Sequence, residues 1–179
     1  MAKIKVGFSV STLYTFPVLS WIIRLFEKWF HSSHVYYELP GSENGEKMAM
    51  VLEASIYDGV NLKPATSFYP TIKVNREYGI EVTEDQIALV LDWWRKHDGT
   101  GYGKMQLVGD AIQKLLSPFG MKNNPFSDGP DTMVCTETVG RVLENVLGLD
   151  VPQDFDVVGL RDIQRVLESD KSGRVTRLI

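Results

Sequence analysis

The stretch Met133–Leu147, MVCTETVGRVLENVL, contains Cys135, the only cysteine of the chain. Its apolar and small residues recur at helical spacing, which predicts a helix capped by Asp131 or Thr132 and ending at Gly148. Cys135 would lie in the first turn of this helix, on the face that should be buried. The question for the rest of the sequence is which groups could accompany a thiol at the start of a helix.

Two interpretations of Cys135 are open at this point. Free cysteine is among the most buried residue types, so this thiol could simply be packed in the core. Alternatively it is a nucleophile, because a helix N-terminus and a nearby imidazolium lower a thiol pKa from about 8.5 to roughly 3.5–7.5. First-turn amides can also stabilise an oxyanion. The second interpretation requires a histidine and a third group that orients it.

A hairpin upstream of the cysteine offers both groups. Residues 34–39, HVYYEL, and 48–54, MAMVLEA, are rich in strand formers. They flank the turn cluster 40–47, PGSENGEK, which predicts an antiparallel pair with a loop longer than the tightest type. His34 begins the first strand, and Glu53 interrupts the apolar run of the second. Across the hairpin, Glu53 could accept a hydrogen bond from the His34 ring.

Each of these residues also has an ordinary explanation. His34 could be a polar residue at a strand entry, and Glu53 a solvent-facing residue of a half-buried strand. Glu38 shares the His34 face by alternation and is a weaker substitute for Glu53. His31 and His97 end predicted helices, where a cation suits the helix dipole. His34 is the histidine left without a local capping role.

The remaining pattern predicts an α+β fold in one domain, residues 1–179, with an antiparallel sheet packed against helices. Ser11–Thr15, which holds Tyr14, is a predicted connection. Further strands are predicted at 3–10, 59–62, 71–75 and 79–82, and 174–179 is either a closing strand or a tail. Helices are predicted at 17–30, 105–116 and 159–169, with another from a Thr83 cap to about Lys96. The Gly/Pro/Asn-rich segment 119–130 is a predicted loop.

Composition excludes several kinds of function. The 179 residues have a net charge of −4, which argues against non-specific nucleic-acid binding. One cysteine cannot form an internal disulfide or a cysteine-rich zinc site, and three histidines make a His-rich metal site improbable. We therefore expect no metal and no cofactor.

The sequence also bears on membranes. The start, MAKIKVGFSVSTLY, lacks the long apolar region of a signal peptide, and no segment has about 18 consecutive apolar residues. We expect no transmembrane segment and a protein that is cytoplasmic as synthesised. Segment 17–30, PVLSWIIRLFEKWF, is predicted to be a core helix. Its alternatives are one wall of a lipid-facing groove or a helix on a membrane surface.

The order of these motifs resembles the circularly permuted papain-like amidases of the YiiX/YaeF type, relatives of the NlpC-type cell-wall peptidases. The matching pieces are Ser33-His34-Val35, Val51-Leu52-Glu53-Ala54, Gly59-Val60, Gly101-Tyr102, the Cys135 motif and Val151-Pro152. The resemblance covers roughly residues 5–165. It implies a circularly permuted papain-like fold in which Cys135 is the nucleophile, His34 the base and Glu53 the orienting residue. Tyr14, Ser33, Tyr102 and Thr136 are predicted to contact substrate.

Two departures from the family pattern are visible. The usual Cys-Ser-Glu-Leu is Cys135-Thr136-Glu137-Thr138 here, and Lys104 follows the Tyr102 segment where the family often has an aspartate. Because Lys104 replaces that aspartate, the resemblance supports no role for the Tyr102 segment other than shaping the cleft.

The sequence is compatible with three functions. The first is a cysteine hydrolase acting on an amide bond of a peptide or isopeptide, with bacterial cell-wall peptides foremost. A cell-wall substrate without a signal peptide would suit a protein that is phage-encoded or released by lysis. The second is a thioesterase or acyltransferase acting on lipid, which the apolar, aromatic segment 17–30 suggests. The third is a non-catalytic structural or binding module.

Overall fold

A computed structural model describes residues 1–11, 31–43, 45–103, 132–151 and 158–179, with the single positions Arg24, Gly109, Ile112, Gln113, Gly120 and Phe155. The predictions for Tyr14, for the helices at 17–30 and 105–116 and for the loop at 119–130 lie outside the described residues, apart from these isolated positions. Within the described part, no helix is long and apolar enough to cross a membrane.

Six antiparallel strands form the central sheet, in the order β4-β3-β2-β1-β5-β8. Their bounds are β1 Ala2–Ser11, β2 His34–Glu43, β3 Glu46–Ser55, β4 Gly59–Pro64, β5 Ile72–Val82 and β8 Val175–Arg177. Two short strands, β6 Gly101–Tyr102 and β7 Thr132–Met133, pair in parallel. The predicted mixed α+β fold with an antiparallel sheet is confirmed.

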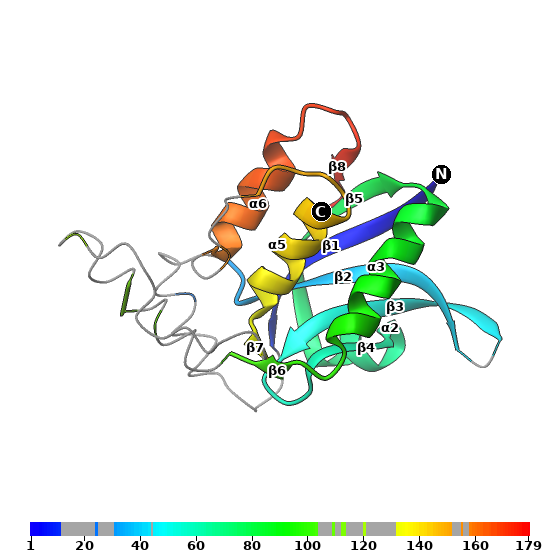
Figure 1. Ribbon diagram of the computed structural model, residues 1–179, viewed down its shortest axis with the longest axis horizontal. Helices are drawn as coiled ribbons and strands as arrows, with labels where there is room; N and C mark the ends of the chain where they lie inside the picture. The colour runs from blue at the N-terminus through cyan, green and yellow to red at the C-terminus, as the bar shows by residue number, and fades with distance from the viewer. Residues whose placement is uncertain are drawn as a thin grey trace.

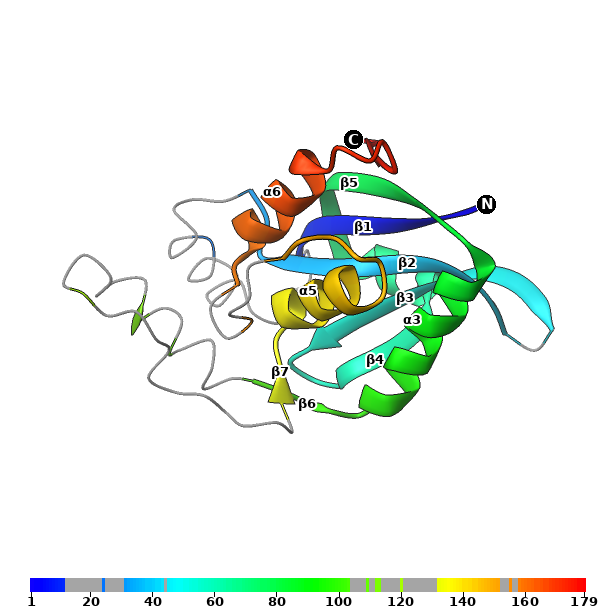
Figure 2. The same ribbon diagram turned by 45° about the horizontal axis from the view of Figure 1, so that its top comes forward.

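The helices of the described residues are α2 Ala65–Phe68, α3 Glu84–His97, α5 Cys135–Asn145 and α6 Leu160–Ser169, and a short 3-10 helix, η1, spans Tyr69–Thr71. Helix α2 packs on one face of the sheet, and α3, α5 and α6 cover the other, as Figures 1 and 2 show. The strands send alternate residues to this side, among them Val6, Tyr37, Leu52 and Ile80, and all four are fully buried with the apolar residues of α5 and α6. Period-two alternation therefore meets helical periodicity in one large core.

The opposite face of the sheet carries a smaller cluster formed by Tyr36, Val51, Ala65 and Phe68. Tyr36 of β2 lies across β1 at Gly7, where a Cβ atom would come within 2.1 Å of its ring. Only glycine leaves room for that ring, whose hydroxyl donates to Glu77 of β5 at 3.3 Å. Polar and aromatic side chains are therefore buried on this face as well as on the helical one.

Several local predictions are confirmed. Thr83 caps α3 through its side chain and Gln86 reaches back to it, which is the capping box expected from the sequence. The last helix begins after Gly159, and 175–177 forms an edge strand paired with β5. The runs predicted at 71–75 and 79–82 are joined in the single strand β5, which pairs with β1, except that Thr71 ends η1.

Two predictions are wrong in detail. The loop predicted at 40–47 is only two residues long, since β2 continues to Glu43 and pairs there with Glu46. The Asn44-Gly45 dipeptide was the signal for such a tight hairpin. The helix of the cysteine is capped by neither Asp131 nor Thr132, because Thr132 belongs to β7 and Val134 is the N-cap.

Candidate active site

Cys135 is the first residue of α5, as the sequence predicted. Its N-cap is Val134, whose side chain has no hydrogen-bond acceptor, so the first amides of the helix have no side-chain cap. The Tyr37 hydroxyl of β2 donates to the Val139 carbonyl at 3.0 Å and fixes the helix one turn beyond the thiol. The positive end of the helix dipole therefore lies at the sulfur.

His34 is the first residue of β2, and its ring meets Glu53 of β3. Glu53 follows Leu52, which is paired with Tyr37, so alternation puts the Glu53 and His34 side chains on the same face. The His34 Nε2 donates to Glu53 Oε2 at 2.6 Å. The hairpin thus brings together the two residues that the sequence proposed as a pair.

The thiol completes a row with these two residues. Burial raises the pKa of Cys135, but hydrogen bonding to His34 and the charge on that ring outweigh burial, with further contributions from the Val35 backbone and the Tyr102 side chain. The net pKa of the Cys135 thiol is lowered. The Cys135 thiol is therefore disposed to ionise beside His34.

Charge is complementary along this row. Burial lowers the pKa of His34, but its hydrogen bonds to Cys135 and Glu53 and the charge on Glu53 raise it overall. Burial likewise raises the pKa of Glu53, while His34 and then Lys63 bring it down to about 2. The described groups therefore favour a thiolate, an imidazolium and a carboxylate in sequence.

Access to the row is limited but not closed. The His34 side chain is 19% exposed, whereas Cys135 is 5% and Glu53 3% exposed. Glu137, in the first turn of α5, would oppose a thiolate by its charge. It instead forms an ion pair with Arg141 at 2.7 Å, which neutralises that charge.

Tyr102 reaches the thiol because β6 pairs with β7 immediately before α5. Tyr102 is opposite Met133, two residues before the cysteine, and the Tyr102 side chain hydrogen-bonds to Cys135. The segment before Tyr102 is held by β4, where Val60 donates from its amide to the Thr100 carbonyl at 2.9 Å. Gly59 permits this approach, since it has φ +64° and a Cβ atom there would lie 2.0 Å from the Thr100 oxygen.

The other candidates are placed as follows. Thr136 is buried beside the cysteine at 7% exposure, and Ser33 is buried with its amide donating to the Ser9 carbonyl at 3.0 Å. Their predicted contact with substrate stays a prediction. Glu38 is engaged elsewhere, in an ion pair with Lys5 at 2.8 Å and a hydrogen bond from Tyr69, and so is not the partner of His34.

The remaining histidines do not join the row. His97 ends α3, bonds the Trp93 carbonyl through Nδ1 at 2.7 Å and stacks on the Trp93 ring at 4.2 Å. His31 precedes β2, and its carbonyl accepts from Asn75 at 2.6 Å. His97 therefore ends a helix as the sequence predicted, whereas the helix that His31 was predicted to end lies outside the described residues.

Sequence reasoning missed two residues of this site. Lys63, on β4, forms an ion pair with Glu53 Oε1, and Phe68, on α2, packs with its ring centroid 6.3 Å from that of His34. Lys63 lies just beyond the strand predicted at 59–62. It shares the alternation of Asn61, which is opposite Glu53, and that alternation was the available signal.

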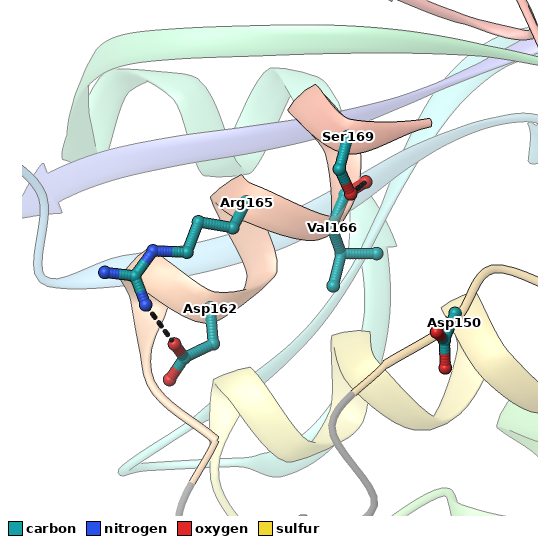
Figure 3. Close-up of a pocket in the computed structure, with 5 residues that line it drawn as sticks. All are labelled: Asp150, Asp162, Arg165, Val166 and Ser169. Carbon is teal, nitrogen blue, oxygen red and sulfur yellow. Dashed lines mark hydrogen bonds and ion pairs between the residues drawn. The ribbon is translucent and has the colours of Figure 1, made fainter. Parts of the chain in front are cut away.

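A hollow of about 340 Å³ lies elsewhere, on α6 and the segment that follows α5 (Figure 3). Asp150, Asp162, Arg165, Val166 and Ser169 line it. Arg165 pairs with Asp162 at 3.0 Å inside this set. None of these residues contributes to the Cys135 row, so the hollow is separate from the candidate active site.

No protein-family model matches this sequence, and no curated protein matches it significantly. A solved structure is similar over nearly the whole chain: the crystal structure of metalloprotein YiiX from Escherichia coli O157:H7, DUF1105. The identity is 15%, the TM-score is 0.60, and the match covers 98% of this chain and 94% of that one. The chain has a YiiX-like fold. The likeness agrees with the family that the motifs resemble, and at this identity it concerns the fold alone.

YiiX is described as a metalloprotein, so we tested whether the described residues here suit a metal ion. They contain no group of three or more His, Cys, Asp and Glu that could hold one. His34 bonds Glu53 and is the side-chain partner of the Cys135 thiol, and Lys63 places a cation on the remaining Glu53 oxygen. The row does not fit a metal site.

Proposed function

We propose that this protein is a cysteine hydrolase that cleaves an amide bond through a thioester acyl-enzyme. Cys135 is the nucleophile, His34 the general acid and base, and Glu53 the residue that orients His34. The observation that carries the proposal is the 2.6 Å contact between His34 Nε2 and Glu53, with the same ring bonded to the Cys135 thiol. The YiiX-like fold supports it.

The proposed reaction uses these groups in turn. The Cys135 thiolate attacks the carbonyl carbon and forms a C–S bond, while the oxyanion is stabilised by amides at the start of α5. The His34 imidazolium gives its proton to the amide nitrogen as the C–N bond breaks, and the amine leaves. His34 then takes a proton from water, the hydroxide attacks the thioester, and the C–S bond breaks to release the acid and the thiolate.

The chain order also enters the proposal. In ordinary papain-like enzymes the cysteine precedes the histidine, whereas here His34 and Glu53 precede Cys135. We therefore propose a circularly permuted papain-like arrangement. Peptide and isopeptide amides are the proposed substrates, and cell-wall peptides are the first to test because the motifs resemble those of NlpC-type enzymes.

Alkylation by iodoacetamide, followed by intact mass, tests the nucleophile directly because the chain has one cysteine. An ordinary thiol is only about 0.3% ionised near pH 6, so we expect folded Cys135 to react at least about tenfold faster than the urea-unfolded chain. His34→Ala should abolish this advantage and Cys135→Ser should not be labelled. His97→Ala is the matched control, because that ring contacts Trp93 instead.

The reaction itself is tested with peptide amides, cell-wall peptides and acyl thioesters offered in parallel. Accumulation of a Cys135 thioester with a peptide substrate, lost in Cys135→Ser, supports the amidase. Turnover of acyl thioesters alone would favour the thioesterase. Labelling of Cys135 no faster than in the unfolded chain, together with no effect of His34→Ala, would falsify the proposal.

A further inference from the structure

Lys63 holds the second oxygen of the Glu53 carboxylate. Glu53 is 3% exposed, and its two oxygens have separate partners: Oε2 accepts from His34, and Oε1 is paired with the Lys63 ammonium. A buried carboxylate with only one partner would retain a desolvated oxygen, which is costly. Lys63 removes that cost and at the same time fixes which oxygen faces the histidine.

The strand register explains how this lysine comes to the site. In β4, Lys63 is opposite Val51 and Asn61 is opposite Glu53, so Lys63 is the diagonal neighbour of Glu53 on the same face. Its ammonium lies 5.3 Å from the centroid of the Phe68 ring, and that ring also packs against His34. The Lys63 side chain is 31% exposed, so its ammonium is only partly desolvated. The cation is held by both a carboxylate and an aromatic face.

We propose that Lys63 is a positioning residue of the active site and extends the Cys-His-Glu row to a fourth member. It acts through Glu53, which it holds ionised and oriented toward His34. The row then alternates thiolate, imidazolium, carboxylate and ammonium, with no net charge to bury. This inference rests on the proposed function.

Removing the Lys63 charge should change the titration of the whole row. Lys63→Met leaves Glu53 Oε1 unpaired, so the Glu53 pKa rises and the carboxylate is no longer fixed toward His34. An imidazolium that is held less firmly by its carboxylate stabilises the thiolate less, so the pH at which Cys135 ionises should rise. The rate of Cys135 alkylation falls at low pH as the thiolate is protonated, and this part of the rate–pH profile is its acid limb. We expect the acid limb to move up by about one pH unit, since a nearby opposite charge shifts a pKa by roughly 1–3 units.

The experiment compares Lys63→Met, Lys63→Gln and Lys63→Arg with the natural protein. Arginine keeps the positive charge, so Lys63→Arg should have the acid limb of the natural protein. Glutamine keeps a hydrogen-bond donor but no charge, so Lys63→Gln should have the shifted limb. Lys47→Met on β3 is the matched control, because Lys47 is an exposed strand lysine opposite Ser42, near the hairpin turn. The pKa of Glu53 is read in parallel from the carboxyl carbon by NMR, on folded protein without substrate.

The outcomes separate the two proposals. A raised Glu53 pKa and a raised acid limb in Lys63→Met and Lys63→Gln, both restored by arginine, support the inference. The inference is overturned if Lys63→Met and Lys63→Gln fold and show the same acid limb and the same Glu53 pKa as the natural protein. Slow labelling of the natural protein itself would instead overturn the proposed function. In that case the Glu53 pKa still decides whether Lys63 holds the carboxylate.

Discussion

The Tyr37 hydroxyl donates to the main-chain carbonyl of Val139 at 3.0 Å, joining the strand of the histidine to the helix of the cysteine. Tyr37 is fully buried and lies three residues after His34, while Val139 lies four residues after Cys135. One hydrogen bond therefore spans the two elements that must keep a thiol and an imidazole in contact. The row of Cys135, His34 and Glu53 therefore depends on this packing as well as on its own contacts.

Tyr37→Phe should loosen the helix against the sheet. It removes a buried donor, which lowers the free energy of unfolding by about 1 kcal/mol, as for a typical buried hydrogen bond. Because the start of α5 can then shift from His34, we expect slower alkylation of Cys135 near neutral pH. Urea unfolding and the labelling rate measure the two effects.

Tyr78→Phe is the control for that variant. Tyr78 is also buried, but its hydroxyl donates to Glu168 of α6 at 2.6 Å. We expect a stability loss without a change in the Cys135 labelling rate. Equal slowing in both variants would mean that general destabilisation, and not the position of α5, governs reactivity.

The sequence predicted the parts of this site that rest on local pattern. Alternation in 34–39 and 48–54 determines that His34 and Glu53 share a face, and helical spacing puts Cys135 in a first turn. His97 was correctly set apart because ending a helix is local chemistry. The resemblance to a family with the same motif order added the expectation that these three residues meet.

Other features depended on contacts between distant segments. Lys63 becomes a partner of Glu53 only through the register of β3 with β4, for which the alternation of β4 was the one signal in the sequence. The N-cap was misplaced because Thr132 pairs in β7 with Gly101 of β6, a parallel contact that outweighs its capping preference. The tight hairpin was missed although Asn44-Gly45 marked it.

Glu53 should make the stability of the fold depend on acid pH. Its pKa falls from 4.5 to about 2 on folding, because His34 and Lys63 outweigh its burial. A lowered folded-state pKa stabilises the protein fully above the unfolded value and loses that contribution as pH falls toward the folded value. We expect ~3 kcal/mol to be lost between about pH 4.5 and 2 through this group.

Glu53→Gln isolates this contribution from that of the other carboxylates, which titrate in the same range. The measurement is the free energy of unfolding in urea at a series of pH values. The variant should be less stable at neutral pH, and its stability should fall less steeply toward acid. Parallel curves for the two proteins would contradict a depressed Glu53 pKa.

Gly59→Ala should disturb the thiol from a distance. Gly59 has φ +64°, and an added Cβ atom would lie 2.0 Å from the Thr100 carbonyl oxygen, so the backbone before Tyr102 must move. We expect a loss of roughly 2–4 kcal/mol from strain and overpacking together. Because the Tyr102 side chain then moves away from Cys135, the acid limb of the alkylation profile should shift to higher pH. His34 and Glu53 are both retained in this variant. Urea unfolding and labelling against pH measure both effects.

Gly45→Ala separates strain from contact in that prediction. Gly45 also has a positive φ, +84°, but nothing lies within 4 Å of an added Cβ atom, and it sits in the hairpin turn between β2 and β3. It should lose only about 1 kcal/mol from the left-handed backbone, with the labelling profile unchanged. If Gly59→Ala folds and labels like Gly45→Ala, the Thr100 approach does not position Tyr102, and the thiolate then depends on His34 and the helix start alone.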